Sequence, residues 1–141
     1  MSANWVFWAF LSAVFAALTA IFGKIGVAGV PADMATLIRT VVIFAVTAAI
    51  VAATGQWQAP STISGRTWFF LVLSGVATGA SWLAYYRALS IGDAARVAPV
   101  DKLSIVFVAV FAVIFLGETL SLVHWLGILL ITAGALVLVL F

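Results

Sequence analysis

The sequence predicts an all-α integral membrane protein, a bundle of five transmembrane helices. Of the 141 residues, 67% are hydrophobic and only 7% are charged, whereas a soluble domain has roughly 45–50% apolar and 25% charged residues. The mean hydropathy is +1.35. The apolar residues are gathered in five stretches, each close to the roughly 20 residues that a helix needs to cross a bilayer. The chain therefore cannot cover a water-facing surface.

The five stretches are residues 4–27, 33–54, 67–90, 94–116 and 123–141. Between the first two lie Gly29 and Pro31, which end helices, and Asp33 is expected to cap the second helix. The longest polar segment, residues 55–66, follows the second stretch and is expected to be the main extramembrane loop. We predict that residues 1–141 form one transmembrane domain.

The remaining stretches are bounded in the same way. Gly92 and Asp93 are typical of a helix end followed by an N-cap, and residues 117–121 predict a tight hairpin between the last two helices. Pro99 lies inside the fourth stretch, where it either kinks the helix before Asp101 or marks the true start of that helix. Strands are not expected, because the apolar runs are long and do not alternate.

Composition excludes several functions. The chain has no cysteine, so no thiol chemistry is expected, and its six basic residues are too scattered to read phosphates. No nucleophile–base pair, phosphate loop or metal-ligand spacing is present. We therefore expect no enzyme, no nucleic-acid partner, no metal and no cofactor, and we expect the lipid bilayer as the main partner.

Charged residues inside spans are the best functional indicators, because each costs about 2.5–3.5 kcal/mol to insert at a helix centre. Arg39 lies roughly 9 Å into the second span, and Asp101 lies roughly 12 Å into the fourth if that helix is continuous. An Arg39–Asp101 salt bridge between two helices is expected, either as a gate or as a simple lock. Lys24 and Lys102 lie at similar depth, where their long stems also allow them to reach the headgroups.

Neighbouring residues on a helix do not face each other. Asp101 and Lys102 should therefore point about 100° apart, so each needs a partner on another helix or in a water-filled cavity. Together with Lys24 and Arg39 they would form a basic pocket that contains one acid. Such pockets also suit anionic lipid headgroups.

Three side chains near the middle of the third span share one helix face. They are Thr78, Trp82 and Tyr86, spaced four residues apart. An aromatic stripe with hydroxyls suits an amphipathic or cationic solute through stacking and cation–π contacts. The alternative is tight helix packing, with the hydroxyls bonded internally.

With these residues in view, the chain resembles the EamA-type domain of the drug/metabolite transporter superfamily, and in particular its members with a single copy of the domain. The matching segments cover nearly the whole chain and are Phe22–Gly26, Ala35–Thr40, Leu73–Gly79, Ser81–Leu89, Gly92–Ser104, Phe115–Glu118 and Leu126–Ile128.

The resemblance implies a multi-pass transporter of small organic solutes or metabolites in the cell inner membrane. It implies secondary transport by half of an inverted-repeat transporter, paired as an antiparallel homodimer or with a related half. Full-length relatives join two five-helix halves of opposite orientation. The loop charges, Arg87 and Arg96 on one side against Arg66 on the other, give only a weak orientation bias, which suits a chain that inserts both ways.

On this interpretation Trp82, Tyr86 and Thr78 line the cavity, while Arg39, Asp101 and Lys102 gate it or bind a polar group, with Lys24 nearby. Protonation of Asp101 would change its pairing with Arg39 and so bias alternating access. The alternative function is a lipid-binding, lipid-flipping or accessory membrane subunit that transports no solute.

Overall fold

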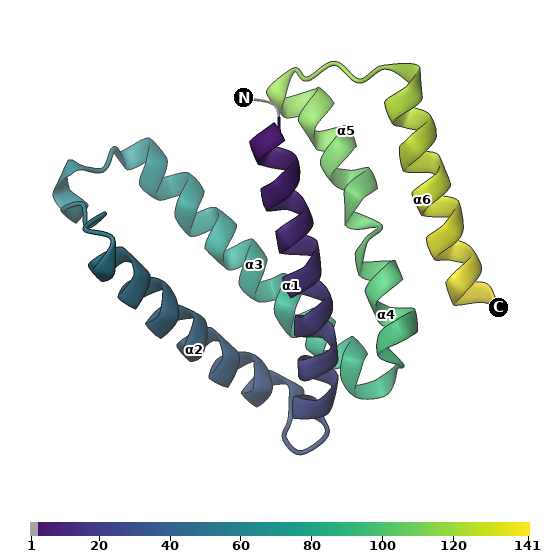
Figure 1. Cartoon of the computed structure of the whole chain (residues 1–141), viewed down its shortest axis with the longest axis horizontal. Coiled ribbons are helices and arrows are strands. Elements are labelled where there is room, and N and C mark those ends of the chain that lie inside the picture. Colours follow the sequence, from purple (N-terminus) through teal and green to yellow (C-terminus); the bar gives the residue numbers. More distant parts are fainter. Residues whose placement is uncertain (1–2) are drawn as a thin grey trace. The chain divides into compact units, whose positions relative to one another are not determined.

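The computed structural model describes residues 3–141 and contains helices as its regular elements over that range (Figure 1). In chain order these are α1 (Ala3–Val27), α2 (Ala32–Ala53), a 3₁₀ turn η1 (Pro60–Thr62), α3 (Gly65–Ile91), α4 (Ala94–Asp101), α5 (Ser104–Leu116) and α6 (Leu122–Leu140).

Five helical segments within residues 3–141 are long and apolar enough to cross a membrane, which confirms the predicted fold class. Their bounds agree with the predicted spans to within two residues at every end. The agreement has a simple cause. A lipid core forces every backbone polar group into an internal hydrogen bond, so length and hydropathy alone fix where helices lie.

The fourth span consists of two helices, α4 and α5, with Lys102 and Leu103 between them. Pro99 lies inside α4, so the interpretation that it marks the start of this helix is wrong. Proline lacks an N–H and removes one hydrogen bond of the helix. Just after it, the backbone hydrogen bonds join residues three apart instead of four. Leu103 N–H donates to Val100 O at 3.0 Å, and Ile105 N–H donates to Lys102 O at 3.0 Å. The fourth span is therefore interrupted directly after Asp101, whereas the kink interpretation of Pro99 placed the change just before it.

Both ends of the last hairpin have clear local causes. Gly117 ends α5 in the left-handed region, at φ +67°, where a side chain would be strained. Ser121 begins α6 with a capping box, in which its hydroxyl accepts from His124 N–H and His124 Nδ1 accepts from Ser121 N–H. The predicted tight turn is thus held by a glycine and a reciprocal cap.

The two aspartates expected to cap helices do not do so with their side chains. Pro31 occupies the cap position of α2, and the Asp33 carboxylate instead accepts hydrogen bonds from Arg87 on α3. Asp93 does occupy the cap position of α4, but its side chain makes no capping hydrogen bond. The reason for the first error is tertiary, since a guanidinium is a stronger partner for a carboxylate than a backbone N–H.

The chain forms two compact units, a first unit up to Ile91 and a second unit from Gly92 to Phe141. In the first unit, α3 packs against both α1 and α2, and Leu89 and Tyr86 of α3 are buried there. In the second unit, α6 packs against α4 and α5.

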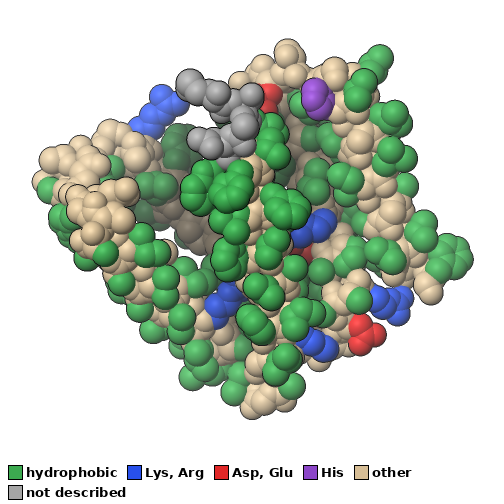
Figure 2. Space-filling view, in the orientation of Figure 1, with side chains coloured by type: hydrophobic (Ala, Val, Ile, Leu, Met, Phe, Trp, Pro, Cys, Tyr) green, Lys and Arg blue, Asp and Glu red, His purple; other side chains and the backbone are tan. Residues whose placement is uncertain are grey.

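Most large apolar side chains are exposed on the helices, and Figure 2 shows them over the visible face, with lysines and arginines only at isolated points. That distribution suits contact with lipid tails.

Candidate functional site

The first unit holds a charged side chain, on a helix able to span a membrane, beside two aromatic rings. The guanidinium carbon of Arg39, on α2, lies 3.9 Å from the ring centroid of Trp82 and 5.3 Å from that of Tyr86, both on α3. The two rings share a face of α3 because they are four residues apart. Each such contact is worth about 0.5–2 kcal/mol. The predicted aromatic stripe therefore binds a cation, and that cation belongs to the protein itself.

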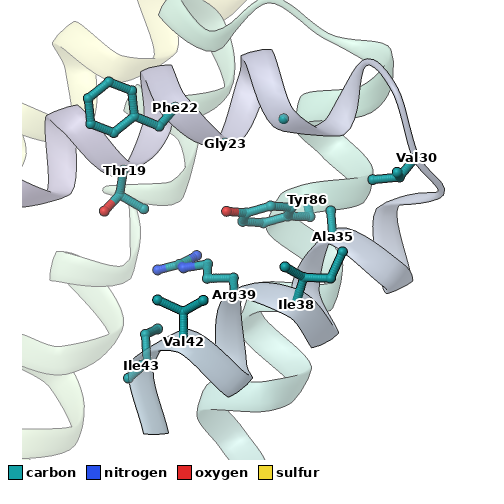
Figure 3. Close-up of a pocket in the computed structure, with 11 residues that line it drawn as sticks. Thr19, Phe22, Gly23, Val30, Ala35, Ile38, Arg39, Val42, Ile43 and Tyr86 are labelled. Carbon is teal, nitrogen blue, oxygen red and sulfur yellow. The ribbon is translucent and has the colours of Figure 1, made fainter. Parts of the chain in front are cut away.

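A cavity of about 510 Å³ lies beside Arg39 in the same unit, and we call it the Arg39 cavity (Figure 3). Its lining comes from all three helices and the α1–α2 loop and consists of Thr19, Phe22, Gly23, Gly26, Val30, Ala35, Ile38, Arg39, Val42, Ile43 and Tyr86.

The walls of the Arg39 cavity are mainly aliphatic and aromatic, with a few polar groups among them. Figure 3 shows the guanidinium of Arg39 and the hydroxyl of Tyr86 directed into the same space, with Thr19 contributed by α1. Small-molecule sites typically have volumes of about 300–1,000 Å³ and combine apolar walls with a small number of placed polar groups. The Arg39 cavity meets both criteria.

Gly23 sets the position of the tyrosine. A Cβ at this position would lie 3.0 Å from the hydroxyl oxygen of Tyr86, 3.2 Å from its Cζ and 3.5 Å from a methyl of Leu89. Ordinary carbon contacts are about 3.5–4.0 Å, so only glycine lets the ring lie this close to α1. Neither Gly23 nor Thr19 was predicted to be a site residue. The available signal was their spacing, one helical turn apart on α1.

Lys24 has a structural role in the first unit. Its Nζ donates to the carbonyl of Leu89 at 2.7 Å. Leu89 is in the last turn of α3, where carbonyls lack partners within the helix and favour a positive charge. The expected basic pocket is therefore divided, because Lys24 supports a helix end while Arg39 faces a cavity.

Arg87 and Asp33 form an ion pair that the sequence analysis did not predict. The guanidinium donates through Nε to one carboxylate oxygen at 3.1 Å and through Nη2 to the other at 2.8 Å. The pair is exposed and links the start of α2 to the end of α3. A signal was present, since the predicted topology places both residues on one side of the membrane.

The other two predicted charges lie in the second unit and contact each other. Lys102 Nζ lies 3.2 Å from a carboxylate oxygen of Asp101. The expectation that these neighbours point apart was wrong, because Asp101 is the last residue of α4 and Lys102 already belongs to the interruption. The predicted Arg39–Asp101 pair would join the two units and stays a prediction.

Thr78 does not line the Arg39 cavity. Its hydroxyl donates to Ser74 O within α3 at 2.8 Å, which is the internal bond of the packing alternative, but the residue is exposed and not tightly packed. Trp82 also lies outside the lining and acts through its contact with Arg39. Among the described residues, no group of three or more His, Cys, Asp or Glu side chains is placed to hold a metal ion.

Five helices that can cross a bilayer, with a solute-sized cavity among three of them, define a multi-pass membrane protein. The sequence matches the EamA-like transporter family over residues 3–140, and the chain belongs to that family. It is 71% identical, over the full length of both chains, to a protein of Sinorhizobium sp named an uncharacterized transporter in the cobO 3' region. No solved structure matches the chain. The protein is a membrane transporter, and it works on a solute in a lipid bilayer.

Proposed function

We propose that this transporter is a secondary transporter that moves small organic solutes through the Arg39 cavity. The observation that carries the proposal is the cavity itself, about 510 Å³ in volume, with apolar walls and the polar ends of Arg39 and Tyr86 directed into it. It lies among membrane-spanning helices, where a solute has to be shielded from lipid. The same proposal places the protein in the cell inner membrane.

Coupling to an ion gradient is assigned to the pair in the second unit. Among the described residues Asp101 is the only acid in the interior of a membrane-spanning segment, and it lies directly before the interruption between α4 and α5. Interrupted helices beside charged residues are typical of transporter coupling sites. Protonation of Asp101 would release Lys102, and the freed lysine would favour a different conformation of the interruption.

The transport assay uses proteoliposomes and radiolabelled L-phenylalanine, choline and hippurate, which are zwitterionic, cationic and anionic. The diagnostic variant is Gly26→Leu, because Gly26 lines the cavity and a side chain there meets open space. The matched control is Gly29→Leu, which also meets open space but lies outside the lining.

We expect at least one of the three solutes to enter wild-type and Gly29→Leu vesicles, and uptake to fall at least about tenfold in Gly26→Leu vesicles. A cavity filled by a leucine leaves less room for a solute, so binding is lost. Equal uptake by both variants would show that solutes pass elsewhere. Uptake of none of the three probes above protein-free vesicles would count against solute transport.

The dimer is the other part of the proposal. One chain supplies five spans, and the family resemblance implies a second half of opposite orientation, either the same chain or a related one. The chain has no cysteine, so Gly29→Cys and Gln56→Cys each introduce a unique thiol, in the loops at opposite ends of α2.

An impermeant maleimide applied to intact cells should label a fraction of each variant if the chain inserts both ways. Complete labelling of one variant and none of the other would mean a fixed orientation. That result would leave a related partner chain as the only route to an inverted pair.

A further inference from the structure

Arg39 already occupies the aromatic faces that a cationic solute would need. Its guanidinium lies 3.9 Å from the Trp82 ring centroid, within the range of a cation–π contact. A cationic solute in the Arg39 cavity would find this ring covered and a fixed positive charge beside it. Arginine cannot lose its proton in a protein, so the repulsion is present at every physiological pH.

The charge of Arg39 has no acid to balance it in its own unit. Asp33 is the sole carboxylate side chain in residues 1–91, and Arg87 binds both of its oxygens. Of the two other basic residues in this range, Lys24 is bonded to the carbonyl of Leu89 and Arg66 lies outside the cavity lining. Among residues 3–91 that the structure describes, Arg39 alone presents a cation to the cavity.

The hydrogen-bonding groups of the cavity also favour an anion. A guanidinium has five N–H donors and no acceptor, and a tyrosine hydroxyl is a further donor. The contacts described for the Arg39 guanidinium in residues 3–91 are with the faces of two rings, which leave the N–H edges of the guanidinium available. Figure 3 shows these edges and the Tyr86 hydroxyl facing the same space.

We propose that the Arg39 cavity takes a small organic anion, a carboxylate attached to a compact apolar body. The carboxylate would lie against the guanidinium of Arg39 and the hydroxyl of Tyr86, and the apolar body against Phe22, Val42 and Ile43. This assignment rests on the proposed function and names its substrate class. The same anionic chemistry occurs in a lipid headgroup, so the experiment separates the two sources.

The experiment measures binding by the full-length protein in phosphatidylcholine nanodiscs, by calorimetry. The probes are 3-phenylpropanoate, its neutral analogue 3-phenylpropanamide and the cation 3-phenylpropylamine, which share one apolar body. The variants are Arg39→Lys, Arg39→Gln and, as the matched control, Arg66→Gln. Arg66 is also an arginine over a ring, 6.0 Å from the Phe70 centroid, but it lies outside the cavity lining.

We expect the carboxylate to bind at least about tenfold more tightly than the amide, since a hydrogen bond to a charged group is stronger than one between neutral groups. The preference should persist in Arg66→Gln, weaken in Arg39→Lys and vanish in Arg39→Gln. Because the three probes are compared on the wild-type protein, this part of the test does not depend on whether the variants fold. A carboxylate that binds no better than the amide, or more weakly than the amine, would overturn the assignment.

Repeating the titration in nanodiscs that contain phosphatidylglycerol separates the two sources of anion. Undiminished affinity for 3-phenylpropanoate supports a soluble solute, whereas its loss would assign the cavity to a lipid headgroup and overturn the proposal. Selective binding of the carboxylate without uptake in the transport assay would support the anion site and contradict transport through the cavity. Uptake of choline alone would support transport through the cavity and contradict the anion site.

Discussion

Replacing Gly23 by alanine tests how the cavity is built. The added Cβ would lie 3.0 Å from the Tyr86 hydroxyl and 3.2 Å from its Cζ, which is several tenths of an ångström inside an ordinary contact. Tyr86 is only 5% exposed, and its ring also contacts Arg39. The ring has to move away from α1, and the cavity that it lines changes with it.

Two opposing effects determine the size of the change. Alanine in place of a helical glycine stabilises by about 0.5–1 kcal/mol, while an extra methyl in a well-packed region costs about 1–3 kcal/mol. We therefore expect Gly23→Ala to lower the free energy of unfolding by about 1 kcal/mol. The matched control is Gly26→Ala, on the same helix, whose Cβ meets open space and which should be neutral or stabilising.

Equilibrium unfolding in mixed micelles, followed by helical circular dichroism, measures both variants. The double variant Gly23→Ala with Tyr86→Phe removes the oxygen at 3.0 Å and should recover part of the loss. The reasoning is refuted if Gly23→Ala is as stable as Gly26→Ala, because the close approach of Tyr86 to α1 would then carry no cost.

Three further predictions concern the other polar contacts. Neutralising Asp33 or Arg87 alone should lower the free energy of unfolding in the same assay, and exchanging the two residues should restore it. A lower stability of the exchanged variant would mean that the position of each charge matters and not the pairing. Ser121→Ala removes the hydroxyl of the α6 capping box and should cost about 0.5–2 kcal/mol; unchanged stability would show that the cap is replaced by water. Asp101→Asn should abolish the dependence of solute uptake on an imposed proton gradient while leaving downhill exchange, and retained dependence would exclude Asp101 as the coupling group.

The membrane spans were predictable because their cause is local. A bilayer demands long apolar helices, and the separators at Pro31 and Gly117 carry their own helix-ending chemistry. The interruption after Asp101 was only half predictable. Pro99 predicts that the α-helix is disturbed nearby. The residue at which α4 ends, however, depends on which carbonyls the N–H groups after Pro99 donate to.

The partners of the charged residues were harder to predict, because pairing depends on how helices rotate about their axes. The sequence indicated that Arg39 is costly to insert into a membrane and that Trp82 and Tyr86 share a helix face. It did not indicate that Arg39 on α2 contacts the two rings on α3. Asp33 was assigned to its own helix end for the same reason, although Arg87 lies within reach only in three dimensions. The spacing of Gly23 one helical turn from Thr19 did not single it out, since any glycine on α1 is equally able to accept a tyrosine.

The energetics of Arg39 argue that it is kept for a solute and not for the fold. An arginine at a helix centre costs about 2.5–3.5 kcal/mol to insert, and contact with the face of Trp82 returns about 0.5–2 kcal/mol, which leaves a net cost of about 0.5–3 kcal/mol. A methionine of similar length would pack against Trp82 without that cost. Arg39→Met should therefore be at least as stable as the wild-type protein in micelles and yet lose carboxylate binding. An Arg39→Met protein that unfolds more easily would instead make Arg39 a structural link between α2 and α3.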